Sequence, residues 1–310
     1  MADSKKENLF ELVSSDYIES EKIVAPKYSY WNSVARSFFS KKINYIVLFL
    51  LFLIFFLSFV QPEFSGYDPM VTPNINKPET WLLNPSFKYW FGTDDYGNSL
   101  FDAVWAGART SLLLSFIASI INMFLGVVIG AIWGYSKTVD KFMTEVYNVV
   151  SNVPLILFIM VFMYIVGAGF WQLVAAMTIT GWIYIAYFIR TQVIIIRDRE
   201  YNLASRCLGT GKMRMIKNNI LPYMTSVIVT LLSRELPSYI SYEVFLSYIG
   251  VGIDNRTPSL GRLIQNMSVY MDNKPHVFWI PVIVASVVTV TLYVIGQSLA
   301  DSSDPKTHMM

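Results

Sequence analysis

The sequence predicts an all-α integral membrane protein with six transmembrane helices. Hydrophobic residues make up 54% of the 310 residues and charged residues only 15%, whereas soluble domains usually carry about 25% charged residues. Apolar runs that could cross about 30 Å of hydrocarbon as helices recur along the chain. We place six spans at residues 43–60, 112–134, 148–167, 171–190, 222–249 and 278–299. The net charge of +2 is too small to indicate a nucleic-acid partner.

The first span follows a polar, charged segment, residues 1–42. A cleavable signal peptide places its apolar region close to the N-terminus, so we expect the 43–60 span to remain as a membrane anchor. The third and fourth spans are joined only by the sequence GAGF, which predicts a tight helical hairpin.

Lysine and arginine residues predict the orientation of the spans, because they are enriched in cytoplasmic segments. Seven lie in residues 1–42 and seven in residues 190–221, whereas residues 61–110 carry few. We therefore expect both termini (1–42 and 301–310) and the 190–221 segment to be cytoplasmic. The 61–110 and 250–277 loops should face outside, and residues 111–300 should form the transmembrane core.

The short sequence GTGK at 209–212 superficially resembles a phosphate-binding loop. Such a loop needs a glycine five residues before its Gly-Lys pair and a serine or threonine after it. Those positions hold Arg206 and Met213, which excludes this motif. If the protein uses ATP, another chain must bind it.

Other catalytic and metal-binding patterns are also missing from the sequence. It has no GxSxG or HExxH motif, no His/Cys/Asp group at metal-ligand spacing, and a single cysteine, Cys207. Three carboxylates, Asp94, Asp95 and Asp102, lie near one another without a histidine, so we interpret them as solvated turn and cap residues. We expect no catalytic residue, no metal site and no cofactor bound by this chain.

Residues 199–222, REYNLASRCLGTGKMRMIKNNILP, are too long for a simple connector between two membrane helices. Asp198 can cap a first short helix, and Gly209 can end it. Leu203, Ala204, Cys207 and Leu208 then share one face.

A second short helix can begin at Thr210 in the same segment, with Met213, Ile216 and Ile220 on one stripe. Pro222 suits the first turn of the fifth span. Helices this short are unstable alone in water, so each must pack against something. The residues alone leave two interpretations open. The segment is either an amphipathic element on the lipid surface or a plug in a groove of a partner protein.

This segment resembles the EAA loop of permease subunits in binding-protein-dependent ABC importers. EYNLASRCLG supplies Glu200, Ala204 and Gly209 of that pattern, and NNILP supplies Leu221 and Pro222. The spacing is similar to the oligopeptide and dipeptide branch, the OppC, DppC and AmiD type. Ser205 replaces the second alanine of the pattern, and Asn219 replaces a histidine.

Other segments agree with the resemblance, which covers residues 91–306. FGTDDYGNSLFDAVWAGARTSL (91–112) is similar to the stretch that opens the second span in this branch, with Asn98 and Ser99 in place of an Arg-Asp pair. TPSLG (257–261) resembles the outside loop, and IGQSLADSSDPK (295–306) resembles the ending, with Gln297 and Ala300 at two charged positions.

The resemblance implies a type I ABC importer permease fold with cytoplasmic coupling helices in the 197–221 loop. It implies an OppB-like sister permease, two OppD/OppF-like ATPase subunits that bind ATP and Mg²⁺, an extracellular peptide-binding lipoprotein, a peptide substrate and a bacterial cell membrane location. The residues it assigns to ATPase docking or coupling are Glu200, Tyr201, Ala204, Ser205, Arg206, Leu208, Gly209, Lys212, Leu221 and Pro222. For Arg206 and Lys212, solvated surface charge is an open alternative.

Three charged residues fall inside the fifth span, at Arg234, Glu235 and Glu243. Charges at membrane depth are costly and usually face a cavity or a partner. They could line the translocation path, where Glu235 could contact a peptide amino terminus, or Arg234 and Glu235 could pair with the sister permease. Two other functions stay open, namely a permease of the same family for nickel or a glycosyl-peptide, and an ATPase-independent secondary transporter.

Overall fold

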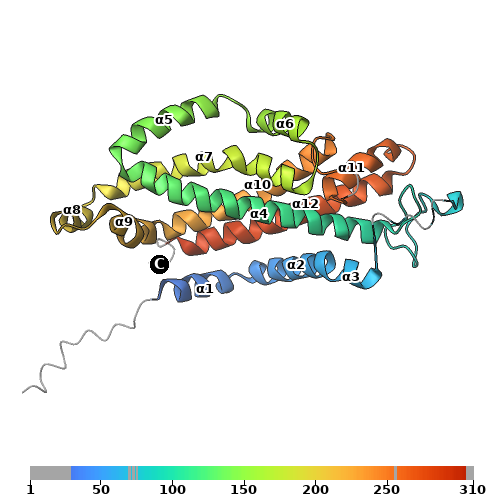
Figure 1. The fold of residues 1–310 in the computed structure, drawn as a ribbon. Helices are drawn as coiled ribbons and strands as arrows, with labels where there is room; N and C mark the ends of the chain where they lie inside the picture. Colours follow the sequence, from blue (N-terminus) through green and yellow to red (C-terminus); the bar gives the residue numbers. More distant parts are fainter. Residues whose placement is uncertain (1–28, 69–70, 72–73, 75, 255–256, 305–310) are drawn as a thin grey trace, which may run out of the picture.

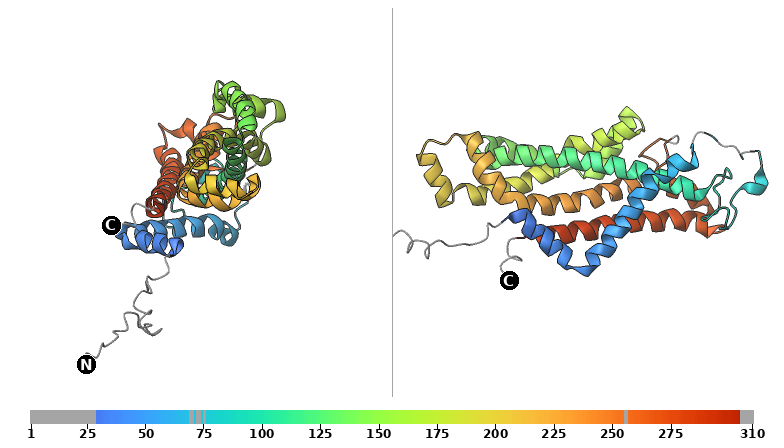
Figure 2. Two further views of the ribbon diagram at one scale, coloured as in Figure 1. Left: turned by 90° about the vertical axis from the view of Figure 1, so that its left-hand side faces the viewer. Right: turned by 90° about the horizontal axis from the view of Figure 1, so that it is seen from below.

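The computed structural model describes residues 29–68, 71, 74, 76–254 and 257–304, and within them all named elements are helices. The long helices lie side by side as an elongated bundle (Figures 1 and 2). Its helices are α1 (Tyr30–Ser40), α2 (Lys42–Phe59), α3 (Gln61–Ser65), α4 (Leu100–Tyr135), α5 (Lys137–Ser151), α6 (Leu155–Val166), α7 (Phe170–Arg197), α8 (Glu200–Cys207), α9 (Lys212–Met215), α10 (Thr225–Tyr248), α11 (Leu260–Met267) and α12 (Pro275–Ser303). Most of the two predicted tails lies outside the described residues, namely residues 1–28 and 305–310.

Four segments of the described chain are long and apolar enough to cross a membrane, which are Lys42–Ser65, Leu100–Tyr135, Phe170–Arg197 and Pro275–Ser303. A fifth results if the bent pair α5 and α6 is taken as one span. These segments correspond to the predicted first, second, fourth, sixth and third spans. The count of six stays a prediction.

The expectation of one continuous helix over residues 148–167 was wrong. The chain breaks between Ser151 and Leu155, and α5 and α6 meet at 78°. Pro154 explains the break, because proline lacks an N–H and disfavours helical geometry in the residue before it. The hairpin predicted after α6 is confirmed, since only Gly167–Gly169 separate α6 from α7.

The predicted fifth span corresponds to α10, which is polar for a membrane helix. It carries Arg234, Glu235 and Glu243, and it falls outside the set that is apolar enough to span. Nevertheless α10 lies centrally, packed against α4, α11 and α12. A charged helix enclosed by apolar helices is typical of proteins that surround a polar pathway.

Helices α4 and α7 form the most extensive contact in the bundle, and a stripe of glycines on α4 makes it possible. A Cβ on Gly126 would lie 2.5 Å from Ile185, one on Gly130 would lie 2.5 Å from the Ala186 carbonyl oxygen, and one on Gly134 would lie 2.7 Å from the Arg190 carbonyl oxygen. Glycines four residues apart let two membrane helices approach closely. The sequence analysis missed this stripe, although its GxxxGxxxG spacing is visible in residues 126–134.

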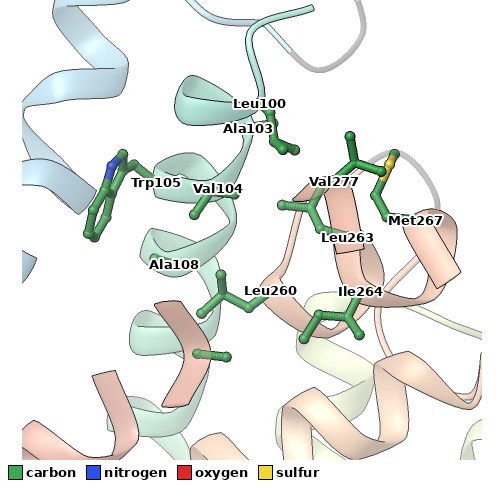
Figure 3. Packing of buried hydrophobic residues seen from close by; sticks show 11 residues of the cluster. Leu100, Ala103, Val104, Trp105, Ala108, Leu260, Leu263, Ile264, Met267 and Val277 are labelled. Atoms are coloured by element: carbon green, nitrogen blue, oxygen red, sulfur yellow. The ribbon is translucent and has the colours of Figure 1, made fainter. Parts of the chain in front are cut away.

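At the end of the bundle where α4 begins, α11 packs between α4, α10 and α12. Its apolar side, including Leu260, Leu263 and Ile264, meets Val104 of α4 and Val277 of α12 in one buried cluster (Figure 3). Ser259 caps this helix by accepting a hydrogen bond from the Arg262 N–H at 3.2 Å. The predicted 250–277 loop therefore contains a buried helix that the sequence analysis did not foresee.

The predicted 61–110 loop also contains helical residues, because α3 opens it and α4 begins at Leu100. With 36 residues, α4 is about 54 Å long and extends beyond a 30 Å hydrocarbon layer. Asn98 and Ser99 have clear local roles. Asn98 donates to Asp94 at 3.3 Å, and Ser99 caps α4 by accepting from the Asp102 N–H at 3.4 Å.

Asp94 is a buried turn residue and not the solvated carboxylate that we expected. It is 6% exposed, and its Oδ1 accepts from the backbone N–H groups of Tyr96 at 2.9 Å and Asn98 at 2.7 Å. Burial raises the pKa of Asp94 despite these hydrogen bonds. Burial and the neighbouring Asp94 charge raise the pKa of Asp95 to about 6.

Residues 30–40, which we had placed in a polar tail, form α1 instead. Val34 and Phe38 are its buried residues, and the Tyr30 hydroxyl donates to the Ser303 carbonyl oxygen at 2.9 Å. The described chain ends therefore meet beside α12. Helices α1, α8 and α9 lie at one end of the bundle, and α11 lies at the other (Figure 1). The predicted cytoplasmic segments thus share one end.

Candidate functional site

The candidate functional site is the segment between α7 and α10, which projects from one end of the bundle (Figure 1). It contains α8, a turn at 208–211, α9, one π-helical turn at Ile216–Ile220 and a 3-10 turn at Leu221–Met224. We call residues 198–224 the coupling segment, after the role that the resemblance predicts for it. The two predicted helices are present in it, although α9 begins at Lys212 and not at Thr210, and it spans only Lys212–Met215.

The inner side of the coupling segment belongs to the protein core. Met215, Ile216, Ile220 and Met224 are buried, and they pack in one cluster with residues of α4 and α7. This burial anchors the second half of the segment to the membrane helices. Of the stripe that we predicted, Ile216 and Ile220 are buried as expected, but Met213 is 65% exposed.

The outer side of the segment is exposed. Leu208 is 86% exposed and Leu203 is 46% exposed, so the predicted apolar face of α8 covers nothing in the described chain. The exposed members of the predicted docking set are Glu200, Ala204, Arg206, Leu208, Gly209, Lys212 and Pro222. Tyr201, Ser205 and Leu221 are only partly exposed.

Polar contacts join the two halves of the coupling segment. Asn219 Nδ2 donates to Asn202 Oδ1 at 3.2 Å and to Ser205 Oγ at 3.1 Å. Asn202 is buried and donates in turn to the Ile196 carbonyl oxygen of α7 at 2.9 Å. The rings of Tyr201 and Tyr223 stack with centroids 5.2 Å apart. The two residues that depart from the resembled pattern, Ser205 and Asn219, are therefore hydrogen-bonded to each other.

Asp198 does not cap α8 as we predicted, because the residue at the cap position is Arg199. Asp198 accepts hydrogen bonds from Arg206 Nη2 at 2.9 Å and from Arg197 Nε at 3.2 Å. The hydrogen bond from Arg206 lowers the pKa of Asp198, and Arg197 adds to this effect. The Arg206 charge is thus paired within the chain, whereas we had considered pairing with an ATPase or with solvent.

The turn between the short helices depends on Gly209. Its φ of +82° lies in the left-handed region, and its N–H donates to the Arg206 carbonyl oxygen at 2.9 Å. This is the helix stop that the sequence predicted. Gly211 has ordinary extended geometry with φ of −66° and ψ of 154°, so Gly209 alone of this pair needs glycine's backbone freedom.

We expect the replacement of Asn219 by alanine to loosen the coupling segment. The change leaves the side-chain oxygen Oδ1 of the buried Asn202 without the Asn219 donor. The loss of this hydrogen bond costs about 1–3 kcal/mol of stability. Hydrogen exchange measured by mass spectrometry should show faster exchange of the α8 amides. Asn218→Ala is the matched control, because Asn218 is the exposed neighbour of Asn219 and makes no such buried contact within the described residues. Asn219→His, which places the residue of the resembled pattern, should keep the protection, and unchanged α8 exchange in Asn219→Ala would contradict the role.

The three charged residues of α10 occupy different environments. Glu243 is fully buried, and its carboxylate accepts from Ser111 Oγ at 2.6 Å and from Ser247 Oγ at 2.8 Å. Ser111 Oγ also accepts from the Leu260 N–H at 3.2 Å. In this structure Glu243 therefore joins α4, α10 and the start of α11 in the protein interior.

Glu235 and Arg234 border two adjacent cavities, and Ser238 lines both of them. Glu235 borders a cavity of about 300 Å³ between α6, α7 and α10, together with Tyr239 and Tyr242. Arg234 borders a more open cavity of about 680 Å³ between α10 and α12. Among the described residues, neither side chain takes part in an ion pair with another residue of this chain. Both positions are compatible with a lining of a polar path.

Comparisons with known proteins place this architecture in a family. Residues 126–309 match the family described as "Binding-protein-dependent transport system inner membrane component". The chain is 48% identical over 299 residues to the oligopeptide transport system permease protein AmiD of Streptococcus pneumoniae, covering 96% of this chain and 97% of that protein. It is 31% identical to the oligopeptide transport system permease protein OppC of Bacillus subtilis, with the same two coverages.

A solved structure shares the fold. It is the MetNI methionine ABC transporter in inward-facing conformations, with a TM-score of 0.54 and 15% identity, covering 66% of this chain and 96% of that chain. The shared fold and the similarity along nearly the whole sequence agree with the helical bundle and its projecting segment. The chain therefore belongs to the family of binding-protein-dependent transport system inner membrane components, as a multi-pass permease component of the ABC transporter class.

Proposed function

We propose that this chain is the permease subunit of an ATP-driven oligopeptide importer of the bacterial cell membrane. It would form half of the translocation path with an OppB-like sister permease, and an extracellular lipoprotein would deliver the peptide. Two OppD/OppF-like ATPase subunits would bind ATP and Mg²⁺. The names of the similar permeases from S. pneumoniae and B. subtilis support the substrate class.

The observation that carries the proposal is the construction of the coupling segment. Its inner side is anchored by buried residues and by the Asn219 contacts to α8, whereas Leu208 and Leu203 are exposed. An anchored element with an apolar outer face suits docking into a groove of a partner protein. Because it continues directly into α7 and α10, a movement of the partner would be passed to the membrane helices.

The proposal also assigns each segment to one side of the membrane. The ends of the described chain and the coupling segment would lie in the cytoplasm, and α11 with the 76–99 segment would lie outside. Six spans would then include α10 as the fifth, because Glu243 is buried and Arg234 and Glu235 border cavities.

The experiment is purification of the importer from its native membrane in mild detergent. The ATPase subunits should co-purify with the unmodified chain. Leu208→Asp should weaken their retention at least about tenfold, because a charge replaces the highly exposed apolar side chain at the C-terminal cap of α8. Val269→Asp is the control, since Val269 is 79% exposed near α11, at the opposite end.

Retention of the ATPases by Leu208→Asp would contradict docking through α8. If the unmodified chain binds no ATPase and still drives uptake from an ion gradient, the secondary-transporter alternative is correct. Uptake of nickel or a glycosyl-peptide without uptake of simple peptides would favour a family member for another solute.

A further inference from the structure

The cavity beside Glu235 is built of a carboxylate and aromatic rings. Tyr184 of α7 and Tyr239 and Tyr242 of α10 border it together with Glu235 and Ser238. Its volume of about 300 Å³ is at the lower end of ligand pockets, which span about 300–1,000 Å³. It can therefore hold one end of an extended substrate.

Glu235 has no cationic partner among the described residues of this chain. Its side chain is half-buried near the middle of α10, which the proposed topology places within the membrane. The neighbouring Arg234 borders the other cavity, and no ion pair joins the two within the described residues. A half-buried carboxylate in a membrane helix is costly unless a positive charge accompanies it.

The Tyr239 side chain of the cavity is held in place by a hydrogen bond from α4. Asn122 of α4 donates from Nδ2 to the Tyr239 hydroxyl at 2.6 Å and to the Met177 carbonyl oxygen at 3.1 Å. Gly181 allows this arrangement, because a Cβ there would lie 2.8 Å from the Tyr239 hydroxyl. Tyrosine faces attract cations, most strongly where water is excluded.

We propose that this cavity binds a primary ammonium group of the transported substrate. The Glu235 carboxylate supplies the counter-charge, and the tyrosine rings enclose the cation. The inference rests on the proposed function, since it assigns a subsite to a peptide permease. The ammonium group is either the α-ammonium at a peptide's amino terminus or that of a lysine side chain, because both have the same charge and hydrogen-bond donors.

A cysteine in place of Ser238 tests the charge of the cavity. Ser238 is exposed, lies one helical turn from both Arg234 and Glu235, and borders both of their cavities. In the assembled, detergent-solubilised importer, Ser238→Cys is labelled with a trimethylammonium and with a sulfonate methanethiosulfonate reagent. The ratio of the two rates should fall at least about fivefold when Glu235→Gln is added. The Glu235→Gln comparison isolates the carboxylate, because Arg234 is present in both proteins. Mass spectrometry also follows Cys207, an exposed cysteine of this chain that should not respond.

The substrate arm uses the same Ser238→Cys importer with its binding protein present. Trialanine should slow the labelling at position 238 at least about fivefold with Glu235 in place, and the Glu235→Gln variant should lose this protection. N-acetyl-trialanine should not protect. Protection by N-acetyl-Ala-Lys-Ala would identify the side-chain ammonium as a ligand, and its failure would restrict the site to the α-ammonium.

Each contrary result is decisive. A rate ratio that Glu235→Gln leaves unchanged, equal protection by free and acetylated trialanine, or no protection by either, would overturn the ammonium site. Trialanine uptake into vesicles by the unmodified importer is measured in parallel. Absence of uptake counts against the proposed peptide function, whereas normal uptake with contrary labelling counts against the ammonium site alone.

Discussion

Replacement of Gly209 by proline should reduce peptide uptake at least about tenfold while ATP hydrolysis by the assembled importer continues. Gly209 has a φ of +82°, whereas proline is held near −65°. Proline also removes the N–H that donates to the Arg206 carbonyl oxygen. The turn between α8 and α9 must therefore change direction, and the exposed face of α8 must move relative to α10. Uptake and ATPase activity are measured on the same reconstituted vesicles.

Gly211→Ala is the matched control for Gly209→Pro. Gly211 lies two residues away, its backbone angles suit any residue, and a Cβ there would meet nothing within 4 Å. This variant should keep both uptake and ATP hydrolysis. Normal uptake in Gly209→Pro would exclude a coupling role for the turn, and loss of the ATPase subunits would make the turn a docking determinant instead.

Replacement of Gly130 by valine should prevent stable packing of α4 on α7. A Cβ at this position would lie 2.5 Å from the Ala186 carbonyl oxygen and 2.9 Å from the Ala186 Cα. Both atoms belong to the backbone of α7, so no rotamer change relieves the clash, and the helices must separate. Overpacking of a well-packed interior costs about 1–3 kcal/mol, and we expect the upper part of this range.

The measurement is thermal unfolding of the purified chain or complex in detergent, followed by size-exclusion chromatography. Val128→Leu controls for added volume on the same helix, because Val128 is 39% exposed and points away from the core. It should leave the unfolding temperature nearly unchanged. A Gly130→Val protein as stable as the parent would show that the α4–α7 contact can widen without cost.

The sequence analysis was most successful where one local signal dominates. Apolar runs located four segments that the structure forms as long apolar helices, because a helix satisfies its backbone hydrogen bonds within itself in lipid. Gly209 predicted the end of α8, since few other residues adopt a left-handed conformation there. The EAA-like spacing of Glu200, Ala204 and Gly209 led to the family that the comparisons confirm.

The sequence analysis failed where the outcome depends on contacts between distant residues. Pro154 is a local signal that we overlooked, but it does not predict the 78° bend or the packing of α6 against α7. Asp198 carries a typical capping side chain, yet Arg206 competes for it across the helix end. Asn219 and Ser205 looked like two independent departures from a pattern, and only folding brings them within 3.1 Å.

The sequence by itself predicted an all-α membrane protein with a long segment between its fourth and fifth predicted spans, and the resemblance of that segment to the EAA loop indicated a permease. These properties follow from composition, periodicity and short motifs, which act over a few residues. Only the tertiary structure decided the surroundings of each charged residue of α10. Glu243 is closed off by Ser111 and Ser247, whereas Glu235 borders a tyrosine-lined cavity. The physical reason is that the environment of a charge is set by the helices packed around it, and no local sequence pattern encodes those helices.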